Sequence, residues 1–239
     1  MKSSKVSLKK RGYIEESEII NYQHLSEQEL ITILNSTLAY ERTIAVRLLS
    51  KIRNINDLKF AELLLKALYK EKSLYSKLEI CNLLKQGNIN VARLMTRYLG
   101  CIGNNQYKQL PKKVSKKKSY PLPRDIIARS LAKMDPLIIP ALIEVLHGDD
   151  ISKLSEAIDA IGFILFYNQN ELRDGYYNIL ISTMQKYHNN NIIYWKCVTC
   201  LSAFNTSKSI SLLKSILTGD TPKIIKQEAN RSLLILKQY

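Results

Sequence analysis

The chain has 239 residues, of which 46% are hydrophobic, and this is enough for a continuous buried core in one or two domains. Glycine (8) and proline (6) both fall well below their average usage, which argues against a turn-dense all-β protein and against disorder. The formal net charge of +15 makes nucleic acid, acidic proteins and anionic membranes the partner classes to consider.

Residues 1–25 form a basic N-terminal segment in which we expect a capping helix. Residues 2–11 hold five basic side chains and no acid. Glu15, Glu16 and Glu18 follow where a signal peptide would need its apolar region. The longest apolar run, 160–166, is far shorter than the roughly 20 residues of a membrane span. We therefore expect a cytoplasmic protein with no membrane partner.

From residue 26 onward the sequence follows a helical period, without the alternation typical of strands. Ser26 gives the first start signal, because Glu29 stands three residues later, as in a capping box. Glycine, asparagine, aspartate and proline then divide the chain into paired helices. The six predicted pairs are 26–35 with 40–53, 57–71 with 74–86, 89–101 with 122–134, 136–147 with 151–167, 171–187 with 192–204, and 207–218 with 222–237.

The second helix of each pair repeats one apolar pattern. Its small or apolar anchors are Ala45, Ile80, Ile127, Ala157, Cys197 and Ala229. Four residues later stand Leu49, Leu84, Leu131, Ile161, Leu201 and Leu233, and seven residues after the anchor stand Ile52, Gly87, Met134, Ile164, Phe204 and Leu236. These positions span about 60° of helical arc and predict one buried stripe per helix. The anchors recur 30 to 47 residues apart, which is typical of stacked helical hairpins.

The longest of these intervals contains a Lys-rich insertion within the third hairpin, residues 104–120, which we call the lysine loop. Residues 108–118 hold six lysines and no acid. Without residues 2–11 and 108–118 the chain has 25 basic and 21 acidic residues, so the excess charge lies in one tail and one loop. Clusters of like charge stay solvated. They either serve only to keep the protein soluble or act as arms that contact a partner. We hypothesise that the lysine loop gates or extends a binding groove.

Residues 41–52, 123–134 and 226–237 resemble the second helix of HEAT repeats, which carries the pattern Arg-x-x-Ala-x-x-x-Leu. The basic position holds Arg42, Lys77, Arg124 and Lys226, whereas Leu154 and Tyr194 occupy it in the fourth and fifth pairs. The resemblance implies an all-α, armadillo-like α-α superhelix, a solenoid of about six HEAT-like helical hairpins over residues 26–239. It also implies that the arginine is structural and pairs with a neighbouring acidic residue.

Three arginines stand two residues beyond their anchors, opposite the buried stripe, and we expect them to be exposed on a concave face: Arg47, Arg129 and Arg231. Together with the loop lysines they are candidates for contacting a partner or a phosphate backbone. These lysines are Lys112, Lys113, Lys116, Lys117 and Lys118. The equivalent positions of other hairpins hold Asn82, Asp159 and Thr199, so an ordinary solvated helix face is the alternative.

Trp195, the sole tryptophan, stands beside Tyr194, and the two are further candidates for contacting a partner. Ordinary packing is the alternative. HEAT-like glycosylases that remove alkylated DNA bases use Trp and Tyr near a catalytic Asp, which stabilises a developing positive charge. No acid lies between Gly175 and Gly219, although Asp159 on the preceding hairpin could face the same groove.

Cys197 and Cys200 have the spacing of a redox or zinc pair, but no second pair of this spacing occurs. Cys197 also occupies an anchor position, so we expect a buried structural cysteine.

The chain carries none of the short motifs of phosphate-binding loops, hydrolase elbows or zinc proteases. We therefore expect no catalytic residue, no metal ligand and no small-molecule cofactor. The expected function is non-catalytic binding, in which a concave face takes a protein or peptide with acidic character. The alternative is sequence-independent binding of nucleic acid, which would weaken steeply with salt. An alkylpurine DNA glycosylase-like enzyme is a third hypothesis.

Overall fold

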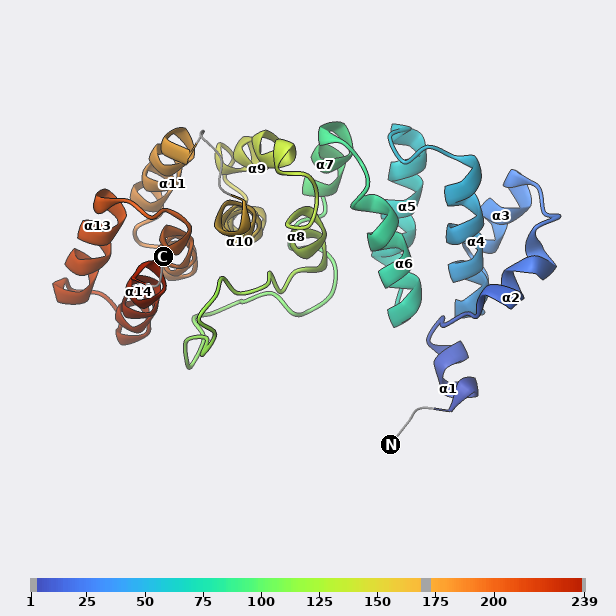
Figure 1. The fold of residues 1–239 in the computed structure, drawn as a ribbon, viewed down its shortest axis with the longest axis horizontal. Helices are drawn as coiled ribbons and strands as arrows, with labels where there is room; N and C mark the ends of the chain where they lie inside the picture. Colours follow the sequence, from blue (N-terminus) through green and yellow to red (C-terminus); the bar gives the residue numbers. More distant parts are fainter. Residues whose placement is uncertain (1–3, 169–172, 238–239) are drawn as a thin grey trace. The chain divides into compact units, whose positions relative to one another are not determined.

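The computed structural model describes residues 4–168 and 173–237, and every regular element among them is a helix (Figure 1). The chain divides into two compact units, Met1–Met95 and Thr96–Tyr239, which we describe separately. No helix within the described residues is long and apolar enough to cross a bilayer.

Unit 1 is built on α4, which packs against α1, α3 and α6, while α5 packs against α6. The predicted capping box is confirmed: the Glu29 N–H donates to Ser26 Oγ at 3.4 Å, and the Ser26 N–H donates to Glu29 Oε2 at 2.8 Å. The helices are α1 (Lys5–Lys10), α2 (Glu16–Ile19), η1 (Ile20–Tyr22), α3 (Glu27–Ile33), α4 (Ala39–Ile52), α5 (Leu58–Lys70), α6 (Leu74–Leu84) and α7 (Ile89–Thr96).

Unit 2 follows the same alternation of packed helices. α10 packs against α8, α9 and α12, and α14 packs against α12 and α13. Its helices are α8 (Ile126–Leu131), η2 (Pro136–Ile138), α9 (Ile139–Leu146), α10 (Ile151–Tyr167), α11 (Arg173–Lys186), α12 (Asn191–Cys200), η3 (Leu201–Ala203), α13 (Ser207–Thr218) and α14 (Lys223–Leu236). Residues 171 and 172, where we expected α11 to begin, lie outside the described residues.

The predicted buried stripe is confirmed at all but one of its positions. All six anchors are buried, as are the six residues four positions later. The exception is Ile52, which is 55% exposed. It is the last residue of α4, and Arg53 already has an extended backbone, so the helix ends before this position can face the core.

The second helix of the third predicted pair is shorter than expected. We predicted a helix over 122–134, but α8 begins only at Ile126. Pro123 disfavours a helical conformation for Leu122 before it. Asp125 then caps the helix, because its Oδ1 accepts the N–H of Ala128 at 2.8 Å. The first helix of this pair is also shorter, since α7 ends at Thr96 and not at residue 101.

The basic N-terminal segment is packed onto unit 1. The N–H of Tyr75 donates to the Arg11 carbonyl at 3.0 Å, and Gly12 has a φ of +88°, which favours glycine. Lys5 pairs with Glu15 at 3.1 Å, and Lys9 pairs with Glu18. Part of the segment's positive charge is therefore neutralised within the unit.

Candidate functional site

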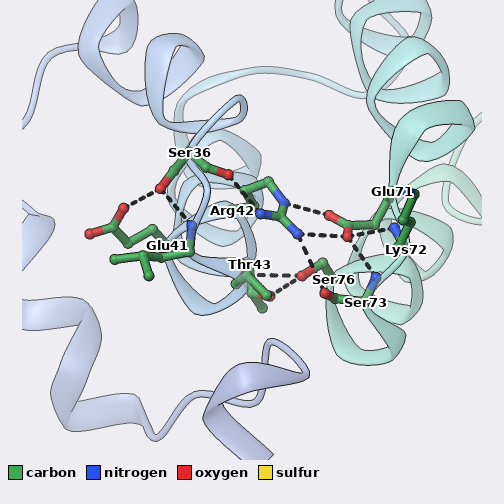
Figure 2. Close-up of polar contacts among 10 residues, drawn as sticks. Ser36, Glu41, Arg42, Thr43, Glu71, Lys72, Ser73 and Ser76 are labelled. Carbon is green, nitrogen blue, oxygen red and sulfur yellow. Dashed lines mark hydrogen bonds and ion pairs between the residues drawn. The ribbon is translucent and has the colours of Figure 1, made fainter.

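Arg42 of α4 has the surroundings of a structural arginine (Figure 2). Its Nε and Nη2 donate to the two carboxylate oxygens of Glu71 at 2.7 and 2.8 Å, and its Nη1 donates to the Ser36 carbonyl at 2.6 Å. The side chain of Glu71 is only 3% exposed. Burial alone would raise the pKa of Glu71, but the hydrogen bonds from Arg42 and from the Ser73 N–H outweigh it, and the pKa is lowered. This arginine joins α4 to the end of α5 and is not available to a partner.

The prediction that Arg47 is exposed is wrong. Its Nε and Nη2 each donate to a carboxylate oxygen of Glu79 at 2.9 Å, and its Nη1 contacts Glu16 at 2.7 Å. The side chain is 27% exposed. The helix face that lies opposite the core in an isolated hairpin is covered here by α6 and by the N-terminal segment.

Arg231 of α14 is also buried, at 7% exposure, and this contradicts the same prediction. Its Nε donates to Glu228 Oε1 at 2.9 Å, and its Nη1 lies 3.1 Å from the Lys117 carbonyl and 3.3 Å from the Ser119 carbonyl. Arg231 is buried because the lysine loop folds back over α14. It therefore holds the loop backbone in place.

Arg129 of α8 is half-buried, so the expectation of full exposure is wrong here too. Its Nε donates to the Pro123 carbonyl at 2.8 Å, which turns the side chain toward the end of the lysine loop. Unlike Arg47 and Arg231, it makes no ion pair with a residue that the structure describes.

The lysine loop, the long green segment before α8 in Figure 1, ends at a deeply buried tyrosine. Tyr120 is 2% exposed and packs against Phe163 and Phe166 of α10, with ring centroids 6.4 and 5.8 Å away. A Cβ on Gly162 would lie 1.9 Å from Tyr120 Oη, so only glycine allows this approach. Burial raises the pKa of Tyr120 well above its usual value, and the phenol stays neutral.

The predicted exposure of the loop lysines is confirmed. Lys112, Lys113, Lys116, Lys117 and Lys118 are exposed, and none of them makes an ion pair with a described residue. The loop thus combines a backbone fastened to α14 with side chains that keep their charge for solvent or a partner. Contact with a partner stays a prediction.

Between the loop and α14 lies an open groove of about 710 Å³, which we call the lysine groove. One wall carries Lys113 and Lys116–Lys118, and the α14 wall carries Arg231 and Leu234. Leu234 is 53% exposed, on the face of α14 that points away from the packed core. The groove therefore places an apolar surface beside four exposed positive charges.

A second cavity of about 400 Å³, which we call the aromatic cavity, adjoins the lysine groove and shares Lys113, Lys117 and Arg231 with it. Trp195 and Tyr107 form part of its wall and meet edge to face, with ring centroids 5.0 Å apart. The guanidinium of Arg124 lies 4.4 Å from the centroid of the Tyr107 ring. Asp159, Arg129 and Arg231 also line this cavity. Sequence analysis suggested that Asp159 and Trp195 could face one groove, and this is confirmed.

Behind this wall lies a buried cluster of charges. Lys196 Nζ lies 2.9 Å from Glu156 Oε1 and 2.9 Å from Asp159 Oδ2, and the lysine side chain is 1% exposed. Burial raises the pKa of Asp159 to about 6, although Lys196 opposes the shift. Burial also raises the pKa of Asp125, which accepts a hydrogen bond from Gln106 Nε2 at 2.7 Å. Lys196 bridges Glu156 and Asp159 and so fixes α12 against α10, although Glu156 Oε2 has no hydrogen-bond partner among the described residues.

The remaining candidates lie in the packed interior or at its edge. Trp195 is 8% exposed, and Tyr194 is half-buried. Cys197 and Cys200 are fully buried, and burial raises both thiol pKa values, so the expectation of a structural Cys197 is confirmed. Within the described part of the chain, no group of three His, Cys, Asp or Glu side chains could hold a metal ion.

Sequence reasoning missed Lys196, Tyr107 and Tyr120. A signal existed for Lys196, since a lysine directly before a buried anchor and within an apolar run must find a counter-charge. No local signal marks Tyr107 or Tyr120, because both are placed by contacts of the loop with helices far along the chain.

No family model matches the chain, and no curated protein matches it. Among solved structures, a crystal structure of an engineered protein is 19% identical over 90% of this chain and 100% of its own, with a TM-score of 0.42. A second engineered protein is 18% identical over 89% of this chain and 96% of its own, with a TM-score of 0.41. Likeness this weak indicates neither a family nor a function.

Proposed function

We propose that the protein is a non-catalytic binding protein and that its lysine groove takes an acidic segment of another protein. The proposal includes the finer architecture expected from the sequence, in which the paired helices are HEAT-like hairpins of a solenoid. Stacked hairpins of this kind offer extended binding surfaces.

The observation that carries the proposal is the exposed Leu234 beside the lysines of the loop. An acidic peptide with one apolar side chain would cover Leu234 and neutralise Lys116, Lys117 and Lys118 together. The loop backbone is already fixed by Arg231, so binding would order little of it and would lose little conformational entropy.

The probe for this function is a fluorescein-labelled peptide of glutamates with one central leucine, compared with the same peptide carrying serine in place of leucine. Anisotropy at about 50 and about 200 mM salt would separate charge from apolar contact. We expect the leucine peptide to bind more tightly, and we expect the difference between the two peptides to persist at the higher salt.

Two variants test the groove. Leu234→Ser should remove the preference for the leucine peptide, and the triple variant Lys116→Gln, Lys117→Gln, Lys118→Gln should weaken both peptides about tenfold or more. The matched control removes three exposed lysines of α13 and α14 outside the groove, Lys208, Lys214 and Lys223. An equal loss in the control would show that only net charge matters and would contradict the proposal.

Nucleic acid is the second candidate, favoured by six lysines within residues 108–118 and no acid among them. A labelled random single strand of about 20 nucleotides belongs in the same titration. If it binds more tightly than either peptide, with a log–log salt slope of about −0.7 for each phosphate neutralised, nucleic acid replaces the acidic peptide as the partner.

A further inference from the structure

The aromatic cavity carries positive charge that no described acidic residue neutralises. Its two carboxylates are already engaged, since Asp159 contacts Lys196 at 2.9 Å and Glu228 accepts from Arg231 at 2.9 Å. The other charged residues of its wall are Lys113, Lys117, Arg124 and Arg129, and none of the four makes an ion pair within the described structure. Such a surface attracts an anionic group.

Arg124 is the most informative of these four. It occupies the repeat position that Arg42 holds in α4, yet no described carboxylate stands beside it. Instead its guanidinium lies 4.4 Å from the Tyr107 ring centroid, and the residue is exposed. A guanidinium that lies over an aromatic ring and makes no ion pair keeps N–H donors for a phosphate.

Trp195 adds a second feature that suits a ligand. The residue lines the cavity, is 8% exposed, and its indole N–H has no hydrogen-bond acceptor among the described residues. The indole nitrogen is itself closed to solvent, so Trp195 contributes to the cavity wall through its ring.

We propose that the aromatic cavity binds a nucleoside phosphate. The cavity measures about 400 Å³, within the range of about 300–1,000 Å³ typical of small-molecule sites. The lysines and arginines would hold the phosphate, and Tyr107 with Arg124 would contact the base. Asp159 and Glu228 also line the wall, where each pairs with a basic side chain of the protein. This site shares Lys113, Lys117 and Arg231 with the lysine groove proposed above for a peptide, whereas Arg124 lines only the aromatic cavity and Leu234 only the groove.

The sole tryptophan of the chain makes the test direct, because any change in its fluorescence reports on this cavity. The probes are AMP, GMP, CMP and UMP, with adenosine and inorganic phosphate as the two halves of one ligand. We expect at least one nucleotide to change the Trp195 fluorescence saturably. We expect each half alone to bind at least tenfold more weakly, since neither engages both the aromatic and the cationic walls. Calorimetry with the same probes gives a second readout.

The decisive variant is Arg124→Gln, which should weaken nucleotide binding about tenfold, while Arg124→Lys should retain part of the affinity by keeping the charge. Lys208→Gln on α13 removes an exposed positive charge outside the cavity and should change nothing. Circular dichroism confirms that each variant is folded.

Three results would overturn the proposal. They are the absence of a saturable signal with all four nucleotides at millimolar concentration, binding of phosphate as tight as that of any nucleotide, and equal losses in Arg124→Gln and Lys208→Gln. Leu234→Ser separates the two proposals, since it should abolish the leucine preference of the peptide and leave nucleotide binding unchanged.

Discussion

In unit 1 the arginine at the basic position of the helical repeat, Arg42, makes two hydrogen bonds to Glu71. In unit 2 the arginine at the same position, Arg124, lies over the Tyr107 ring and has no ion pair within the described residues. The sequence pattern around the two is alike, so the pattern alone does not decide what the arginine does. The role of each arginine is determined by the neighbouring segment, which supplies a buried carboxylate in unit 1 and an aromatic ring in unit 2.

Two carboxylates of unit 2 pair with a buried lysine and not with an arginine. Glu156 and Asp159 share the ammonium of Lys196, a residue that is 1% exposed. In unit 2 Lys196 pairs with two buried carboxylates and Arg231 pairs with Glu228, which leaves Arg124 and Arg129 of the cavity wall without a described ion pair. Positive charge is therefore structural at Arg42 and available at Arg124, and only the residues around each arginine show which.

The largest expected effect comes from Lys196→Met. It would leave two buried carboxylates without their counter-charge, and we expect the free energy of unfolding to fall by about 3–5 kcal/mol. Urea unfolding followed by circular dichroism measures this loss. The control is Lys186→Met, which removes the exposed partner of Asp149 and should leave the midpoint nearly unchanged. Equal losses in the two variants would show that Lys196 does not hold the cluster together.

Gly162→Ala probes how firmly the end of the lysine loop is fastened to unit 2. The new methyl group would meet the Tyr120 phenol at 1.9 Å, and we expect a loss of about 3 kcal/mol, the upper end of the usual cost of overpacking. Gly175→Ala in α11 is the matched control, because a Cβ there meets no atom within 4 Å. Thermal melts of both variants measure the loss as a fall in melting temperature. A melting temperature unchanged in Gly162→Ala would mean that Tyr120 moves aside at no cost.

Whether a feature of the fold or the site could be predicted from the sequence depends on how far apart along the chain its contacting residues are. The helices, the capping box at Ser26 and the anchors such as Ala45 depend on neighbours within one or two turns, and the sequence pattern predicts them. The surroundings of Arg231 and Tyr120 depend on a loop folding back over helices about forty to more than a hundred residues later in the chain. No local pattern encodes such contacts, which is why the exposure expected for Arg231 is wrong.

Replacing Arg42 and Arg124 by the same residue tests whether both contribute to the stability of the fold. Arg42→Met leaves Glu71 buried without its partner, and we expect a loss of about 2 kcal/mol. Arg124→Met removes a contact between a cation and a ring at an exposed site, and we expect a loss of about 0.5–1 kcal/mol. Urea unfolding of the two variants in parallel gives the difference. A loss at Arg124 as large as the loss at Arg42 would mean that both arginines are structural.

The smallest expected effect is a difference in the sign of the pH dependence. Burial raises the pKa of Asp159 from 3.8 to about 6, against the opposing charge of Lys196 and with that of Glu156. Between these values the folded state binds more protons than the unfolded state, so this group lowers stability as the pH rises from about 4 to about 6. Glu71 acts in the opposite sense. Its pKa is lowered from 4.5, so its stabilising contribution is complete above that pH and is lost as the pH falls through the folded value.

Urea unfolding between pH 3 and 7 of the wild type, Asp159→Asn and Glu71→Gln separates the two groups, because titrating residues that do not interact with the replaced group cancel in the differences. Relative to the wild type, Asp159→Asn should gain stability as the pH rises from about 4 to about 6. Glu71→Gln should show its deficit above about pH 4.5 and lose that deficit in more acidic solution. If both differences run in the same direction with pH, the carboxylates of the two units share one kind of environment. The contrast between a paired arginine in unit 1 and an available one in unit 2 would then lose its electrostatic basis.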